Sequence, residues 1–157
     1  MSTNSASIPF HPSRSFAGEN SQQGTLSRAI VLAGRVLFSF IFIVAALGHF
    51  SHQTIGYAAA QGVPLASIAV PLSGIIALAG GLSILLGYHA RIGAWLLVLF
   101  LVTVTPVMHD FWAVKDPVMA QMQMIMFLKN LSMLGGALLI SQFGPGPWSL
   151  GSRRNSN

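Results

Sequence analysis

The sequence predicts an all-α fold, an integral membrane four-helix bundle with both termini in the cytoplasm, and three observations support this. Only 7% of the 157 residues are charged, whereas a soluble domain carries about 25%. Four apolar stretches each approach the roughly 20 residues that a helix needs to cross a ~30 Å hydrocarbon core. The Lys and Arg residues near these stretches gather on one side of the predicted membrane, and such a bias marks the cytoplasmic side.

The first two predicted spans lie at 29–50 and 66–87. Both must be helical, because lipid offers no hydrogen-bond partners to a bare backbone. The segment 1–27 before them is rich in Ser, Asn, Gln and Pro, a composition typical of a disordered tail. The apolar stretch that follows is longer than a secretory signal requires, so we expect the first span to remain uncleaved.

The other two predicted spans lie at 92–112 and 118–141. Only "YHAR" separates the second span from the third, which predicts a tight hairpin. Pro106 lies near the end of the third span and should kink it, because proline cannot donate a backbone hydrogen bond. The membrane domain therefore covers 28–141 as an up-and-down bundle, and the Gly- and Pro-containing segment 142–157 is predicted to be a flexible tail.

Basic residues give the orientation of the bundle. Arg28 precedes the first span, Arg91 lies between the second and third, and Arg153 follows the fourth. Lys115 is the only basic residue in the two connections on the opposite side. The positive-inside rule therefore predicts cytoplasmic termini, in a multi-pass protein of the bacterial inner membrane.

Composition excludes several classes of function. The chain has no cysteine, which excludes disulfides, thiol nucleophiles and cysteine-ligated metal centres. Its few Lys and Arg residues are scattered or at the chain ends, so no nucleic-acid partner is expected. His49 and His109 fall at the outer ends of their helices, but too few ligands converge there, and no metal site is predicted.

Polar residues inside the spans are the candidates for a ligand pocket or a proton site, because ionisable groups are costly in lipid. They are Arg35, His49, His109, Asp110, Lys129 and Asn130. Arg35 fits either snorkelling to the headgroups or an inward role that anchors a ligand or a partner helix. Lys129 is near mid-membrane and is predicted to face the bundle interior, with Asn130 bordering the same cavity.

Several stretches make the chain similar to the DoxX family of small bacterial four-span membrane proteins. They are "GRVLFSFIFIVAALGHF", "LAGGLSILLGYHARIGAW", "MHDFW" and "FLKNLSMLGGALLI", in this order and within one four-span frame. The resemblance places His49, His109 and the Lys129–Asn130 pair at the family's recurrent polar positions. Many relatives carry glutamate in an E-x-x-G-G pattern where this chain has Ala77, which puts any activity that depends on that acid in doubt.

The resemblance implies a membrane subunit of a redox system that binds a quinone-like or small lipophilic molecule or docks an oxidoreductase. The chain has no evident electron carrier and no self-contained catalytic constellation, so whether it is an enzyme stays open. One alternative is a small proton-linked transporter, and another is a structural or assembly protein without chemistry. The expected partners are the lipid bilayer, an oxidoreductase and, as a further possibility, a second copy of the chain.

Overall fold

The computed structural model describes residues 15–151, with side chains from residue 22 on. Every regular element in this range is helical. In chain order the elements are α1 (Ser15–Gly48), α2 (His52–Ala60), α3 (Ala66–Leu86), α4 (Ala90–Met108), the 3-10 turn η1 (Phe111–Ala113) and α5 (Pro117–Phe143). Four of them, α1, α3, α4 and α5, are long and apolar enough to cross a membrane. The predicted all-α fold with four spans is confirmed.

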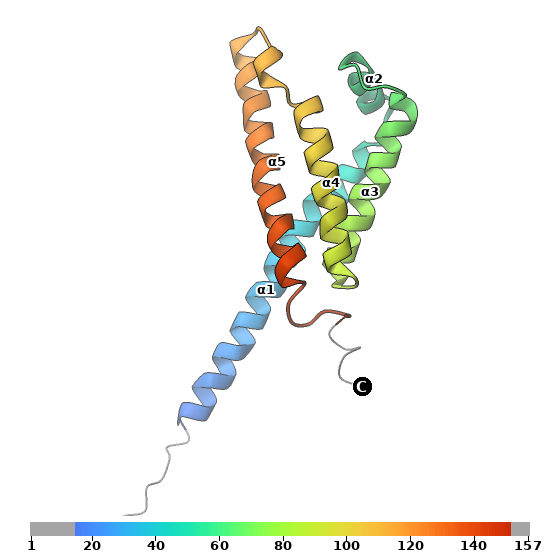
Figure 1. Cartoon of the computed structure of the whole chain (residues 1–157). Helices are drawn as coiled ribbons and strands as arrows, with labels where there is room; N and C mark the ends of the chain where they lie inside the picture. Colours follow the sequence, from blue (N-terminus) through green and yellow to red (C-terminus); the bar gives the residue numbers. More distant parts are fainter. Residues whose placement is uncertain (1–14, 152–157) are drawn as a thin grey trace, which may run out of the picture.

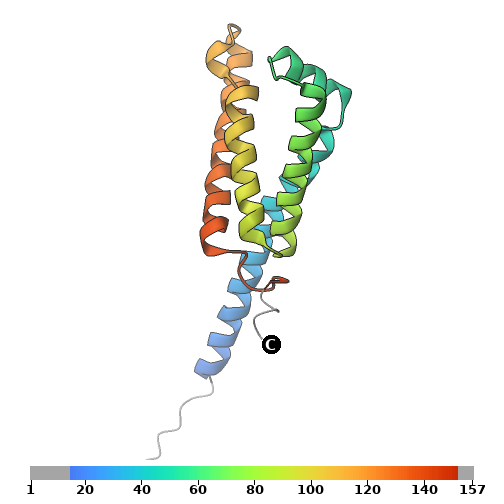
Figure 2. The same ribbon diagram turned by 45° about the vertical axis from the view of Figure 1, so that its right-hand side comes forward.

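The four long helices pack in the order α1, α3, α4, α5 (Figure 1). Helix α1 packs against α3, α3 against α4, and α4 against α5. Helix α1 is tilted and crosses behind the others, and its first turns extend beyond the bundle (Figures 1 and 2). Both ends of the described chain lie at the same end of the molecule (Figure 1), as an even number of spans requires. We call this the inner end, following the predicted orientation, and the opposite end the outer end.

The first helix and the first connection differ from the sequence prediction. Helix α1 begins at Ser15, inside the segment predicted to be disordered, while residues 1–14 lie outside the described part. A formed helix extends at little cost into neighbouring polar residues, which composition alone does not reveal. The connection contains the nine-residue helix α2, whose N-cap Ser51 accepts a hydrogen bond from the backbone N–H of Thr54.

The third span is shorter than predicted. Helix α4 ends at Met108, two residues after Pro106, and the predicted continuation to residue 112 is wrong. The chain leaves the helical conformation at His109, with φ −133° and ψ 50°, and then forms η1. Helix α5 restarts where Asp116 accepts a hydrogen bond from the N–H of Met119 and Pro117 occupies the first turn, a favourable start for a helix.

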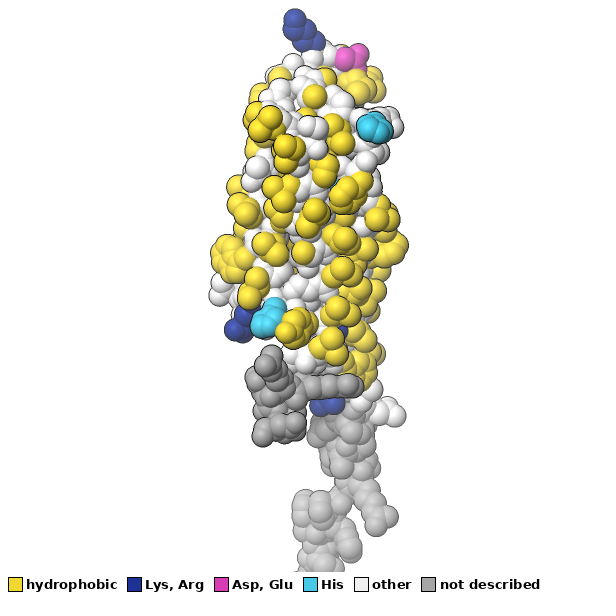
Figure 3. Space-filling model, turned by 90° about the vertical axis from the view of Figure 1, so that its right-hand side faces the viewer, with side chains coloured by type: hydrophobic (Ala, Val, Ile, Leu, Met, Phe, Trp, Pro, Cys, Tyr) yellow, Lys and Arg dark blue, Asp and Glu magenta, His cyan; other side chains and the backbone are white. Residues whose placement is uncertain are grey.

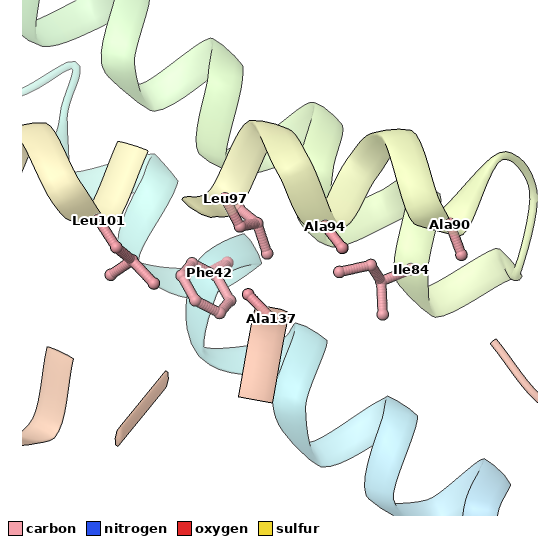
Figure 4. Packing of buried hydrophobic residues seen from close by; sticks show 7 residues of the cluster. All are labelled: Phe42, Ile84, Ala90, Ala94, Leu97, Leu101 and Ala137. Carbon is pink, nitrogen blue, oxygen red and sulfur yellow. The ribbon is translucent and has the colours of Figure 1, made fainter. Parts of the chain in front are cut away.

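The core lies where α1, α3, α4 and α5 approach one another, and it combines large side chains with alanines. Figure 4 shows Phe42 and Ala137 meeting the row formed by Ile84, Ala90, Ala94, Leu97 and Leu101. Glycines bring the helices close, since a Cβ on Gly136 would lie 2.7 Å from the Phe38 ring. Small residues on α3 and α5 thus allow the helices to approach closely.

The surface along the sides of the bundle is apolar. In Figure 3, hydrophobic side chains cover the middle of the molecule, while charged side chains lie towards its two ends. Large hydrophobic residues point outward, for example Leu37, which is 74% exposed. A soluble protein would rarely expose so much apolar surface, so this face fits a lipid environment.

Candidate functional site

A partly open pocket of about 630 Å³ lies at the outer end, and we call it the outer pocket. Residues from the end of α1, from α2 and its following loop, from α3 and from α4 form its wall. The hydrophobic part of the lining comprises Ala58, Val63, Pro64, Ala69, Val70, Val104, Pro106, Val107 and Met108. The polar part comprises His49, Thr54, Gln61, Ser73, Thr103, Asp110 and Trp112. A mostly apolar wall with a few polar groups is typical of a small-molecule site.

His49 is fixed in this pocket from several sides. Its Nδ1 lies 2.9 Å from the carbonyl oxygen of Ala45, one turn back on α1. Its ring lies 5.7 Å from that of Phe100 on α4, measured between centroids. A Cβ on Gly74 of α3 would lie 2.7 Å from the His49 Cβ, so glycine is needed there for the two helices to meet. Asp110 reaches the same pocket because α4 ends just before it.

His109 does not join His49, although the sequence suggested a shared site. Its Nδ1 lies 2.7 Å from Oε1 of Gln123 on α5, and Gln123 Nε2 donates to the hydroxyl of Tyr57 on α2 at 3.0 Å. This chain of hydrogen bonds joins the outer ends of α4, α5 and α2. In the described part of the chain, His109 therefore has a structural contact, and His49 with Asp110 are the predicted candidates that line the outer pocket.

Arg35 lies at the inner end and faces inward. It is only 6% exposed, which excludes snorkelling to the headgroups. Its Nη1 donates to the carbonyl of Pro145 at 3.0 Å, and its Nη2 donates to that of Trp148 at 2.9 Å. Nε is buried and has no hydrogen-bond partner within the described residues. The guanidinium thus holds the segment after α5 rather than a ligand or a partner helix.

That segment is ordered as far as the structure describes it. The backbone N–H groups of Leu150 and Gly151 donate to the carbonyls of Leu86 and Gly87, each at 3.1 Å. Gly87 has φ +67°, and a Cβ there would collide with Ser149. The prediction of a flexible tail from residue 142 is therefore wrong up to Gly151, because these long-range hydrogen bonds are invisible in composition. Residues 152–157 lie outside the described part.

A second cavity of about 590 Å³ lies at this inner end. It is lined by His89 and Arg91 at the start of α4 and by the turn at Gly144 to Gly146. Arg91 is exposed there. None of the six polar candidates singled out in the sequence lines this cavity, and Arg91 of α4 supplies the charge near the turn.

Lys129 points away from the bundle interior, so its predicted orientation is wrong. Its side chain is exposed, and its Nζ lies 3.3 Å from the Sδ of Met126 on the same helix. Asn130, the next residue, is 7% exposed and faces inward as predicted. Adjacent residues on a helix differ by about 100° in direction, so burial of Asn130 turns Lys129 outward.

The described residues contain no cluster of three or more His, Cys, Asp or Glu side chains that could hold a metal. That the chain binds no metal stays a prediction, which elemental analysis of the purified protein would check. The outer pocket offers one imidazole and one carboxylate among its lining, which suits hydrogen bonding to an organic molecule better than metal ligation.

Comparisons with known proteins identify the relatives of the chain. The model of the SURF4 family matches residues 11–156. Inner membrane protein YqjF of Escherichia coli (strain K12) is 33% identical over 122 residues, which cover 76% of this chain and 88% of the relative. Inner membrane protein YphA of the same organism is 26% identical over 132 residues, covering 83% and 94%. No solved structure gives a significant match.

These matches correct the family suggested by the sequence motifs. The motifs resembled the DoxX family, but the matching family model is that of SURF4. Four apolar spans are not by themselves specific to one family. The predicted localisation in the bacterial inner membrane is confirmed by the four spans and by the names of the relatives.

Proposed function

The chain belongs to the SURF4 family, and on that premise we propose that this inner membrane protein binds a small lipophilic molecule in the outer pocket. The observation that carries the proposal is the pocket itself, a partly open space of about 630 Å³ with mostly hydrophobic walls. Its polar lining includes His49 and Asp110, which are suited to orient one polar group of a bound molecule.

The location of the pocket supports a ligand from the bilayer. Pro106 and Val107 on α4 both line it and are both exposed, at the end of a membrane span. Trp112, at the mouth, is 62% exposed, and tryptophan favours the interface between lipid and water. A molecule dissolved in the bilayer can therefore reach the pocket without leaving the apolar phase.

A quinone-like molecule belongs to this ligand class and remains part of the proposal. The further idea of a redox subunit that docks an oxidoreductase rested on the resemblance to DoxX and loses that support. A proton-linked transporter gains no support either, because Lys129 faces outward and His109 is bonded to Gln123 instead of lining the outer pocket. The proposed binding of a lipophilic molecule in the outer pocket requires neither an oxidoreductase partner nor proton-linked transport.

Filling the pocket tests the proposal. Ala69 of α3 lines the outer pocket, whereas Ala79 of the same helix is exposed and does not line it. We expect Ala69→Phe to lower the retention of a co-purified lipophilic compound by roughly tenfold, since crowding a packed site costs about 1–3 kcal/mol. Ala79→Phe should retain it like the parent chain. The measurement is mass spectrometry of organic extracts from protein in nanodiscs.

Two results would contradict the proposal. One is equal retention by Ala69→Phe and the parent chain. The other is the absence, in extracts of the parent chain, of any small molecule enriched over empty nanodiscs.

A further inference from the structure

The hydroxyl groups of Ser73 and Thr103, which line the outer pocket, already donate hydrogen bonds within the chain. Ser73 Oγ donates to the carbonyl of Val70 at 2.7 Å, and Thr103 Oγ1 donates to that of Leu99 at 2.8 Å. A hydroxyl carries one proton and two lone pairs. Towards a ligand, both side chains can therefore only accept hydrogen bonds.

The hydroxyl of Thr54 also has a hydrogen-bond partner within the chain. Ser51 Oγ donates its proton to the carbonyl of Gly48 at 2.9 Å and lies 2.8 Å from Thr54 Oγ1. When the Ser51 proton is on the Gly48 carbonyl, Thr54 is the donor in that pair. Its remaining capacity, like that of Ser73 and Thr103, is as an acceptor.

The titratable groups add two more acceptors. The carbonyl of Ala45 can only accept, so Nδ1 of His49, 2.9 Å away, carries the proton. In the neutral imidazole this leaves Nε2 as an acceptor. Asp110, as a carboxylate, also only accepts.

Few side-chain donors remain in the lining. The backbone N–H groups of Gln61, Gly62 and Val63 are all bonded to carbonyls of α2. The Trp112 indole and the Gln61 side-chain amide can donate, but both side chains are exposed, where water or headgroups can satisfy them. His49, Thr54 and Ser73 are partly buried and need partners from the ligand more.

We propose that the outer pocket selects lipophilic molecules that donate hydrogen bonds, namely lipophilic alcohols and phenols, and for a quinone couple the quinol rather than the quinone. This inference rests on the proposed function and specifies its ligand class. A quinone presents only acceptor oxygens, which would face the lone pairs of Ser73, Thr103 and His49. A neutral donor is favoured over an ammonium, because a charged group is costly to bring through hydrocarbon.

A matched pair of ligands tests the selection. Para-hexylphenol and its methyl ether have nearly the same shape, but only the phenol can donate. Binding is measured by equilibrium dialysis against the chain in nanodiscs, with empty nanodiscs subtracted to remove partitioning into lipid. We expect the phenol to bind about fivefold more tightly, because a net hydrogen bond is worth roughly 0.5–1.5 kcal/mol.

A double variant and a matched control locate the effect. Ser73→Ala with Thr103→Val should lower the ratio of the two affinities below that of the parent chain, because it removes two of the acceptors that line the pocket. Ser141 Oγ donates to Leu138 at 2.7 Å, the same i−3 geometry as Ser73, but Ser141 does not line the outer pocket. Ser141→Ala should therefore keep the selectivity of the parent chain.

The outcomes separate this inference from the proposed function. If the parent chain binds phenol and ether equally well, the donor selection is overturned while lipophile binding stands. If neither binds above empty nanodiscs, both are overturned. The ratio for the parent chain needs no variant, so a folding defect in the double variant cannot hide the answer.

Discussion

Single residues show how far the site could be foreseen. Polarity within a span singled out His49 and Asp110, and both line the outer pocket. Polarity and depth could not tell which way Lys129 points, because the apolar residues of α5 are spread around the whole helix and do not mark its buried face. The acceptor character of Ser73 also escaped the sequence, since it depends on a helix carbonyl taking the hydroxyl proton.

Lys129 carries a prediction at this scale. Its ammonium is exposed near the middle of α5, with Met126 Sδ as its neighbour, and a charge there costs roughly 2.5–3.5 kcal/mol on insertion scales. We expect Lys129→Met to insert as well as the parent chain and to unfold at an equal or higher temperature, measured by differential scanning fluorimetry in detergent.

Lys115 gives the control for Lys129, because it is exposed in the connection before α5 rather than within a span. Lys115→Met should leave the unfolding temperature unchanged. A marked loss of stability in Lys129→Met alone would mean that the amine has a partner, for example in a second copy of the chain.

At the scale of elements, the long helices were predictable and the short segments were not. The spans at 66–87 and 118–141 match α3 and α5 to within a few residues, because hydropathy over about 20 residues averages out local detail. Helix α2 is too short for such averaging. The segment after α5 is ordered by hydrogen bonds to α1 and α3, which no local pattern encodes.

We expect Arg35 to hold the segment after α5 against the bundle through its hydrogen bonds to Pro145 and Trp148. Ser149 is 4% exposed, so a cysteine introduced there, in a chain with no other, should react slowly with a maleimide. Arg35→Met removes two hydrogen bonds from a charged donor, each worth about 1.5–3 kcal/mol. We expect Ser149→Cys to label at least about tenfold faster in this background.

Two further variants, each combined with Ser149→Cys, test the role of the Arg35 guanidinium. Arg28 is exposed on the same helix, and Arg28→Met should leave the labelling rate of Ser149→Cys unchanged. Arg35→Lys should label fast, because a single ammonium does not reproduce the fork of a guanidinium. Slow labelling in Arg35→Met would show that the backbone bonds to α3 hold the segment without Arg35.

At the scale of the whole molecule, the topology remains to be measured. The structure places α2 at one end of the bundle and the α3–α4 turn at the other (Figure 1), and the distribution of Lys and Arg predicts which end is inside. An impermeant maleimide added to intact cells should label Gln53→Cys and spare His89→Cys, both at exposed positions. The opposite pattern would invert the orientation and place the outer pocket in the cytoplasm.

The hydrogen bonds between Arg35 and the last described segment also depend on the order in which the chain is synthesised. The carbonyls that accept from its guanidinium lie 110 and 113 positions later in the chain. At about 5–20 residues per second, a ribosome needs roughly 5–20 s to add them. During that interval Arg35 lacks these two acceptors, and a chain that stops before Pro145 lacks both of them. The segment that contains Pro145 and Trp148 therefore joins the first span only late in synthesis.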